Sequence, residues 1–194
     1  SPPMDKIAIT TNISLPMPVV LIGAQAGGRP NFMPAGWCTR ANATPPMIAC
    51  GINKVHHTAQ GISESRTFSV NIPTVSLLEK TDYCGLVSGD AVDKSGVFSV
   101  CYGKLGTAPM IRECPVCMEC MLVTAIELPT NILFVGEITG AYADTAVVRK
   151  GCADVSAIDP LILTMPDNTY RTLGKVAGKA WNAGLALKKR GDSG

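Results

Sequence analysis

The sequence is poor in charged and aromatic residues. Charged side chains make up 16% of the 194 residues, aromatic ones make up 5%, and the formal net charge is only +2. Domains that bind nucleic acids carry a strongly basic surface, so a balance this close to neutral argues against a nucleic-acid partner. The short basic run Lys188-Lys189-Arg190 is interpreted as a frayed tail.

Long apolar runs are missing as well. No stretch reaches the length that a membrane-spanning helix needs, and no basic segment followed by an apolar one resembles an export signal. We therefore expect a cytoplasmic protein without a membrane partner. Ser1-Pro2-Pro3 before Met4 is interpreted as a cloning remnant and is left out of the fold prediction.

The sequence also lacks the usual residues of hydrolytic catalysis. Its two histidines, His56 and His57, are adjacent, and no G-x-S-x-G motif occurs. Paired catalytic carboxylates are not evident either. We assign no catalytic residue and no metal ligand, and we expect any chemistry to come from a cofactor.

Hydrophobic residues, by contrast, are abundant at 46% of the chain. With this content, 194 residues predict a single domain, residues 1–194, with a sizeable core. The eight cysteines stand inside apolar runs rather than around loops. This placement is typical of reduced core thiols and agrees with a cytoplasmic location.

Short apolar or alternating runs between turn residues predict strands. The expected strands are 17–24, 32–41, 47–52, 67–72, 117–126, 132–142 and 160–165. Helical spacing is expected at 58–65, 75–86 and, near the C-terminus, about 175–187, whereas 87–113 is expected to be irregular. Many strands with few helices predict a mainly β fold, an antiparallel β-barrel with added helices.

The stretch 31–71 holds the candidate site. Pro45 and Pro46 must leave a sheet because they cannot donate to a ladder. After the next strand, Lys54, His57 and Thr58 stand at the start of a predicted helix, where free N–H groups and the helix dipole favour a phosphate. The alternative for these residues is a solvated basic loop that caps the helix.

A series of short motifs, in a fixed order along the chain, resembles a known family. They are Asn31-x-Met33-x-Ala35-x-Trp37-x-Thr39, Pro45-Pro46, Lys54-x-x-His57-Thr58, Ile62 and Phe68-x-Val70-Asn71, followed by the stretch from Tyr83 to Gly89, the Gly136-Glu137 strand and Tyr170-Arg171. The chain resembles the flavin reductase-like, FMN-binding split-barrel family, and within it the flavoredoxin branch. The resemblance covers most of the sequence.

The resemblance implies an antiparallel, Greek-key-like split barrel with FMN as cofactor, and a homodimer with the site near the subunit interface. It places one group of residues along the ribityl chain and isoalloxazine edge: Met33, Ala35, Gly36, Trp37, Cys38, Thr39, Ala41 and Asn42. It places Lys54, His57 and Thr58 at the phosphate, and the segment from Tyr83 to Gly89, with Tyr83 and Ser88, close to the flavin. NAD(P)H or a redox protein is implied as the electron donor.

Two positions separate the chain from many relatives. Gly36-Trp37 replaces the Asn-Ser of many flavin reductases, and Asn131 stands where many NAD(P)H-using relatives carry a histidine. The first difference resembles the flavoredoxin branch, and the second argues against a nicotinamide as electron donor. The leading hypothesis is an electron carrier with retained FMN. The alternative within the family is an NAD(P)H:flavin oxidoreductase that releases reduced FMN.

A different class of function is suggested by Cys114, Cys117 and Cys120, whose spacing resembles a redox dithiol or part of a metal site. Because the next residues are predicted as a strand, Cys114 and Cys120 should face one way and Cys117 the other. We therefore expect core thiols here. A third hypothesis is a flavin-free barrel that acts as an interaction module.

Overall fold

The computed structural model describes residues 5–87 and 96–192, and its main element is a seven-stranded antiparallel sheet. The strand order is β3-β2-β6-β9-β10-β5-β4. The bounds are β2 Val20–Ala26, β3 Arg29–Ala35, β4 Cys38–Asn42, β5 Met47–Asn53, β6 Thr67–Ile72, β9 Val116–Glu127 and β10 Asn131–Ala143. The predicted antiparallel, mainly β fold is confirmed.

The two edge strands of this sheet, β3 and β4, are consecutive in the sequence. Only Gly36 and Trp37 separate them, so one short link joins opposite edges of the sheet. The run 32–41 was expected as one strand and is instead divided at this link. The turn at Pro45 and Pro46 separates β4 from β5 as predicted.

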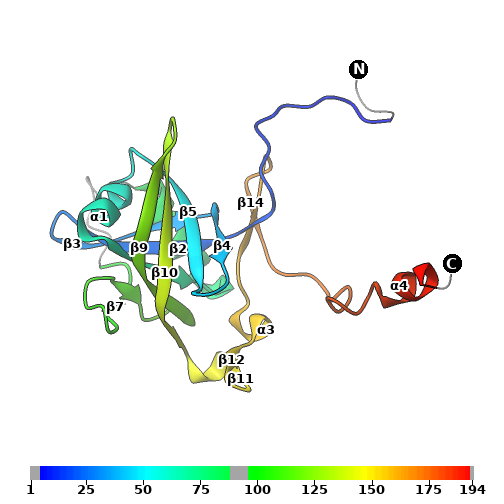
Figure 1. Cartoon of the computed structure of the whole chain (residues 1–194). Coiled ribbons are helices and arrows are strands. Elements are labelled where there is room, and N and C mark those ends of the chain that lie inside the picture. Colours follow the sequence, from blue (N-terminus) through cyan, green and yellow to red (C-terminus); the bar gives the residue numbers. More distant parts are fainter. Residues whose placement is uncertain (1–4, 88–95, 193–194) are drawn as a thin grey trace.

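Phenylalanine and branched aliphatic side chains fill the interior of the curved sheet. Phe68 and Phe134 are fully buried there, and residues of both edge regions, such as Met33 and Ile48, belong to the same cluster. Because the two ends of the sheet share one core, the sheet curls around it (Figure 1). A second cluster around Leu21 and Phe32 lies on the other side of β2 and β3.

Two helices pack on this sheet. Helix α1, His57–Ser65, follows β5 and contacts β2, where Gly61 meets the backbone of Gln25. Helix α2, Leu78–Leu86, follows a short 3-10 turn at Val75–Leu77 and contacts β3. Both helices were predicted from their spacing. The described part of the chain contains no helix that is both long and apolar enough to cross a membrane.

Glu119 fixes the irregular segment after α2 to the sheet. This carboxylate on β9 is fully buried and accepts hydrogen bonds from the backbone N–H groups of Lys104 (3.0 Å) and Leu105 (3.1 Å) and from the Tyr142 hydroxyl (2.7 Å). A methyl group on Gly103 would stand 2.6 Å from the carboxylate, so this approach requires glycine. The short pair β7 Val100–Cys101 and β8 Met110–Ile111 flanks this segment.

A small sheet carries the two ends of the chain. It pairs β1 Met17–Pro18 with β13 Ile162–Thr164, and β13 with β14 Thr169–Arg171. The short pair β11 Val148–Arg149 and β12 Cys152–Ala153 and helix α3 Val155–Ile158 precede it. From this sheet the N-terminal arm, residues 5–16, and the C-terminal arm, residues 172–192, extend away from the barrel (Figure 1).

The expected C-terminal helix at 175–187 is wrong. Residues 172–178 are irregular, and α4 is a shorter helix at Leu185–Gly191. The apolar stripe packs on no other part of the chain that the structure describes, since Val176 is 90% and Trp181 98% exposed. Without packing against a neighbour, an amphipathic helix has little stability, and Gly178 and Gly184 lower its propensity further.

Candidate functional site

The start of α1 is formed by a polar turn. The Asn53 side chain accepts a hydrogen bond from the Val55 N–H (3.1 Å), and the Asn53 carbonyl accepts one from the His56 N–H (3.1 Å). The N-cap residue His56 is extended, and it provides no side-chain cap to the helix. The first turn contains no acidic residue, so its electrostatic field favours an anion.

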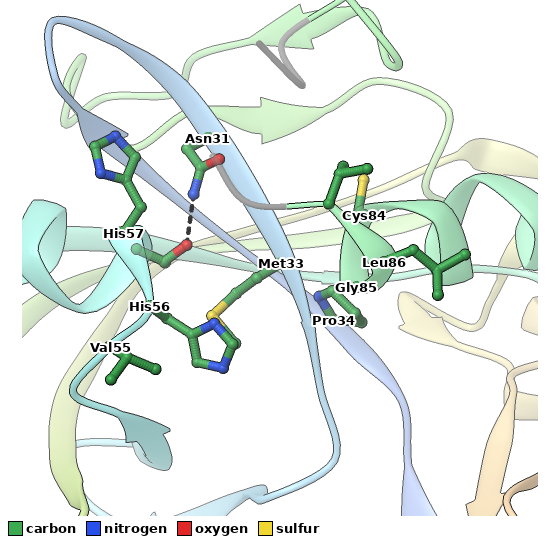
Figure 2. A pocket seen from close by; sticks show the side chains of 11 residues that line it. Asn31, Met33, Pro34, Val55, His56, His57, Cys84, Gly85 and Leu86 are labelled. Carbon is green, nitrogen blue, oxygen red and sulfur yellow. Dashed lines mark hydrogen bonds between the residues drawn. The ribbon is translucent and has the colours of Figure 1, made fainter. Parts of the chain in front are cut away.

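A buried hydrogen bond fixes this helix start against β3. The Asn31 amide donates to the Thr58 hydroxyl at 2.6 Å, and both side chains are almost completely buried (Figure 2). Neutral side chains with a satisfied hydrogen bond can occupy such a place at low cost. The bond positions Thr58 at the wall of the cavity described next.

Two cavities meet beside this helix start. The first, about 410 Å³, lies between the start of α1 and the end of α2, and its walls include Asn31, Thr58 and Gly85. Figure 2 shows Cys84, Gly85 and Leu86 across from the helix start, with Met33 and Pro34 between them. We call it the helix chamber.

The second cavity, about 420 Å³, extends along the link between β3 and β4, and its walls include Gly36, Trp37 and Gly51. We call it the strand chamber. Met33, Pro34 and His56 line both chambers, so the two form one elongated site. Each volume lies within the range of small-molecule sites.

The structure brings together part of the predicted site. Met33, His57 and Thr58 line the helix chamber, and Met33, Ala35, Gly36 and Trp37 line the strand chamber. The motif that begins at Asn31 thus places its alternate residues along one elongated cavity.

Other predicted residues lie outside the chamber walls. Lys54 faces the β9–β10 hairpin, with its Nζ 3.8 Å from Oε1 of Glu127. The Asn42 amide donates to the Pro45 carbonyl (2.8 Å) and so supports the turn. The remaining members are Cys38, Thr39 and Ala41 on β4 and Tyr83 on α2, whereas Ser88 lies outside the described residues. The roles of these residues stay predictions.

Sequence reasoning missed several wall residues. Asn31 opened the quoted motif, yet its role as the partner of Thr58 has no signal in one sequence. The end of α2 reaches the site only through packing on β3. Cys84, Gly85, Leu86 and Val87 belong to the stretch 83–89, which the resemblance placed close to the flavin, whereas Asn31, Pro34, Val55 and His56 were not named as site residues.

The cysteine run has a different geometry from the one predicted. Cys114 precedes β9, so strand alternation does not govern it, and it joins Cys117 in one cluster while Cys120 enters the main core. Burial raises the pKa of Cys117 and of Cys120 to about 12, and it raises that of Cys114 as well. Among the described residues, no cluster of three metal-ligating side chains could hold a metal ion.

The two chambers fit a ligand that is anionic at one end and flat at the other. The anionic end suits the start of α1, beside the Thr58 hydroxyl. Small residues, Gly36 and Gly51, and the indole of Trp37, which is 58% exposed, give the strand chamber room for a planar group.

Comparisons with known proteins identify relatives of this architecture. Residues 13–174 match the family described as flavin reductase-like domain. The structure of flavoredoxin from Methanosarcina acetivorans is 52% identical, covers 94% of this chain and 99% of that one, and superposes with a TM-score of 0.93. For the flavoredoxin of Desulfovibrio vulgaris the values are 30%, 93%, 100% and 0.86.

The match to one curated relative covers only part of that relative's length. An uncharacterised protein of Archaeoglobus fulgidus is 32% identical over 112 residues, which are 57% of this chain and 63% of that protein. The chain thus spans less than two thirds of this relative's length. The family match includes the strands that form both chambers and the helices beside them, and the chain belongs to the flavin reductase-like family.

Proposed function

We propose that the chain is an FMN-binding flavoprotein that retains its cofactor and carries electrons, in the manner of a flavoredoxin. The observation that carries this proposal is the pair of joined chambers, one of which ends at the start of α1. The likeness to two flavoredoxins over nearly the whole of each protein supports it.

In this proposal the helix chamber receives the phosphate and the strand chamber receives the isoalloxazine ring. Bound FMN supplies the redox chemistry. The first turn of α1 and the Thr58 hydroxyl hold the phosphate, and the Asn31 amide keeps that hydroxyl in place. Met33 and Pro34, which line both chambers, contact the ribityl chain, which joins the phosphate of FMN to its ring.

Exposed apolar residues outside the site support a homodimer. Met121, Val123 and Ile126 are exposed on β9, and the C-terminal arm exposes Val176 and Trp181. Exposed apolar patches on a protein often mark a site of interaction with another protein. A second copy of the chain is the partner that the proposal assigns to them, and sedimentation of the purified protein tests it.

The electron donor is a reduced nicotinamide or another redox protein, and the eight free cysteines support a reducing compartment, the cytoplasm. The second candidate is an NAD(P)H:flavin oxidoreductase that releases reduced FMN. Turnover with excess free FMN and NADH separates the two. Rapid release of reduced flavin supports the reductase, and retention of the flavin supports the carrier.

The cofactor assignment is tested by absorbance and by substitution. Purified protein should show flavin bands near ~450 and ~375 nm, with FMN released on heating. Thr58→Val removes the hydroxyl and should weaken FMN binding by roughly 1–3 kcal/mol, or about 5- to 150-fold in Kd. Thr172→Val, an exposed threonine of the C-terminal arm, is the matched control and should leave binding unchanged.

The outcome must distinguish binding from folding. Thr58→Val also leaves the Asn31 amide without its partner, so the melting temperature of the ligand-free variant is measured beside the Kd. An unchanged Kd in a folded variant places the phosphate elsewhere. Lys54→Ala tests a second of the three predicted phosphate residues, since an unchanged Kd there leaves Lys54 as a partner of Glu127 alone.

Thiol labelling tests the cysteine-based alternative. The exposed Cys152 should react quickly at pH 8, whereas burial and a high pKa should make Cys117 and Cys120 far slower in the folded protein. Rapid labelling of the buried thiols, or stoichiometric zinc or iron without flavin, would favour the alternative.

A further inference from the structure

Cys38 and Cys50 face each other across the strand pair β4–β5. Their Sγ atoms are 2.8 Å apart and share a hydrogen bond. The neighbouring Gly51 N–H donates to the Trp37 carbonyl at 2.9 Å, so Trp37 and Gly51 form a hydrogen-bonded pair. The adjacent pair of cysteines is therefore a non-hydrogen-bonded pair, in which opposing Cα atoms come within about 4.5 Å. A disulfide accommodates that separation without movement of the backbone.

The two thiols differ in access. Cys38 is half-buried on an edge strand, whereas Cys50 is fully buried in the core beside Cys120. The hydrogen bond with Cys38, together with burial, raises the pKa of Cys50, which keeps this thiol protonated. Cys38 is therefore the thiol that a reagent reaches first, and Cys50 is the thiol placed to react second.

We propose that Cys38 and Cys50 form a reactive dithiol that reduces low-molecular-weight disulfides and closes into an intramolecular disulfide. The Cys38 thiolate attacks one sulfur of the small disulfide, and the other sulfur leaves as a thiolate. Once Cys38 is in the mixed disulfide, the hydrogen bond that raises the pKa of Cys50 is lost, and Cys50 gives its proton to solvent. The Cys50 thiolate then attacks Cys38 Sγ, and the second small thiolate leaves. The two protein thiols lose two electrons and two protons, and the small disulfide becomes two thiols.

Closure of this bond acts on the strand chamber. The disulfide would tie β4 to β5 directly beside Trp37 and Gly51, which line that chamber. The state of the dithiol is thereby coupled to the wall of the chamber, although neither sulfur belongs to that wall. The proposal does not depend on the identity of the ligand that the chamber holds.

Peptide mapping tests the proposal with oxidised glutathione as the small disulfide. The protein carries Cys152→Ser, which removes the exposed thiol and its intermolecular bonds. After incubation, free thiols are blocked and the chain is cut with trypsin. Cleavage after Arg40 separates Cys38 from Cys50, so a disulfide between them links two peptides, one of which is 41–54.

The expected result is a loss of two free thiols and a Cys38–Cys50 cross-linked peptide that dithiothreitol removes. Cys50→Ser should instead accumulate glutathione on Cys38, and Cys38→Ser should form neither product. The proposal is overturned if Cys38 and Cys50 are both recovered as free thiols, or if the protein without the Cys50 substitution stops at a mixed disulfide on Cys38. Because the unsubstituted pair is mapped directly, a variant that fails to fold does not hide the answer.

Discussion

The buried carboxylate of Glu119 holds the segment after α2, and removing it should unfold that segment first. Its two oxygens accept from the N–H groups of Lys104 and Leu105, and one of them also accepts from Tyr142. A hydrogen bond to a charged group contributes about 1.5–3 kcal/mol. The carboxylate cannot be replaced by water, because it is fully buried.

Glu119→Gln keeps the shape but turns an NH₂ group toward one backbone N–H, so we expect a loss of about 1.5–3 kcal/mol in the free energy of unfolding. Glu119→Ala strands both N–H groups and leaves a cavity, for roughly 3–6 kcal/mol. Tyr142→Phe removes one bond from a partly exposed hydroxyl to Glu119 and should cost less than either change at Glu119.

Urea denaturation of the original protein and of the three variants measures this order of stability losses. Glu127→Gln is the matched control, because it makes the same change on the same strand at a side chain that is 77% exposed. Its loss should stay below about 0.5 kcal/mol. If Glu119→Gln is as stable as the control, the Lys104 and Leu105 amides do not depend on a carboxylate, and the reasoning fails.

Two further predictions concern packing and pH. Gly61→Ala should destabilise the protein by about 1–3 kcal/mol in thermal denaturation, because its methyl group meets the Gln25 carbonyl, although alanine favours helices in open positions. Gly174→Ala, with open space around it, should be close to neutral and serves as the control. Tyr170 is the pH case: burial and its hydrogen bond to Asp82 (2.6 Å) raise its pKa from 10.0 to about 12. The native state then holds this proton more tightly, so the stability difference between the original protein and Tyr170→Phe should be constant below pH 10 and shrink as the pH rises toward 12. A difference that stays constant over that range would contradict the assignment.

The parts of the fold that follow local rules could be predicted from the sequence. Alternation and turn residues located the strand 67–72 and the hairpin of β9 and β10, and a polar turn located the start of α1. Such strand and turn signals are local, because one strand or one helix turn contains them. Met33, Gly36 and Thr58, which line the chambers, were instead named as site residues by the resemblance.

What could not be predicted depends on contacts between distant segments. The resemblance placed the segment 83–89 close to the flavin, but no local pattern shows that α2 packs on β3 and brings Gly85 against the Pro34 ring. Spacing alone cannot show whether an apolar stripe has a surface to cover. Among the described residues, the stripe of Val176 and Trp181 meets no such surface, and the predicted helix at 175–187 did not form there.

The link at Gly36 and Trp37 has a consequence for recognition. Of the described strands, β3 and β4 are the two edges of the main sheet, and an edge strand presents backbone N–H and C=O groups that no neighbouring strand takes up. The strand chamber is lined by the end of β3 and by the link, and by no residue of β4, so a ligand there lies along the β3 edge. Contacts made through the main chain depend little on which side chains are present. The residues in this part of the site can therefore vary while the shape of the chamber is kept.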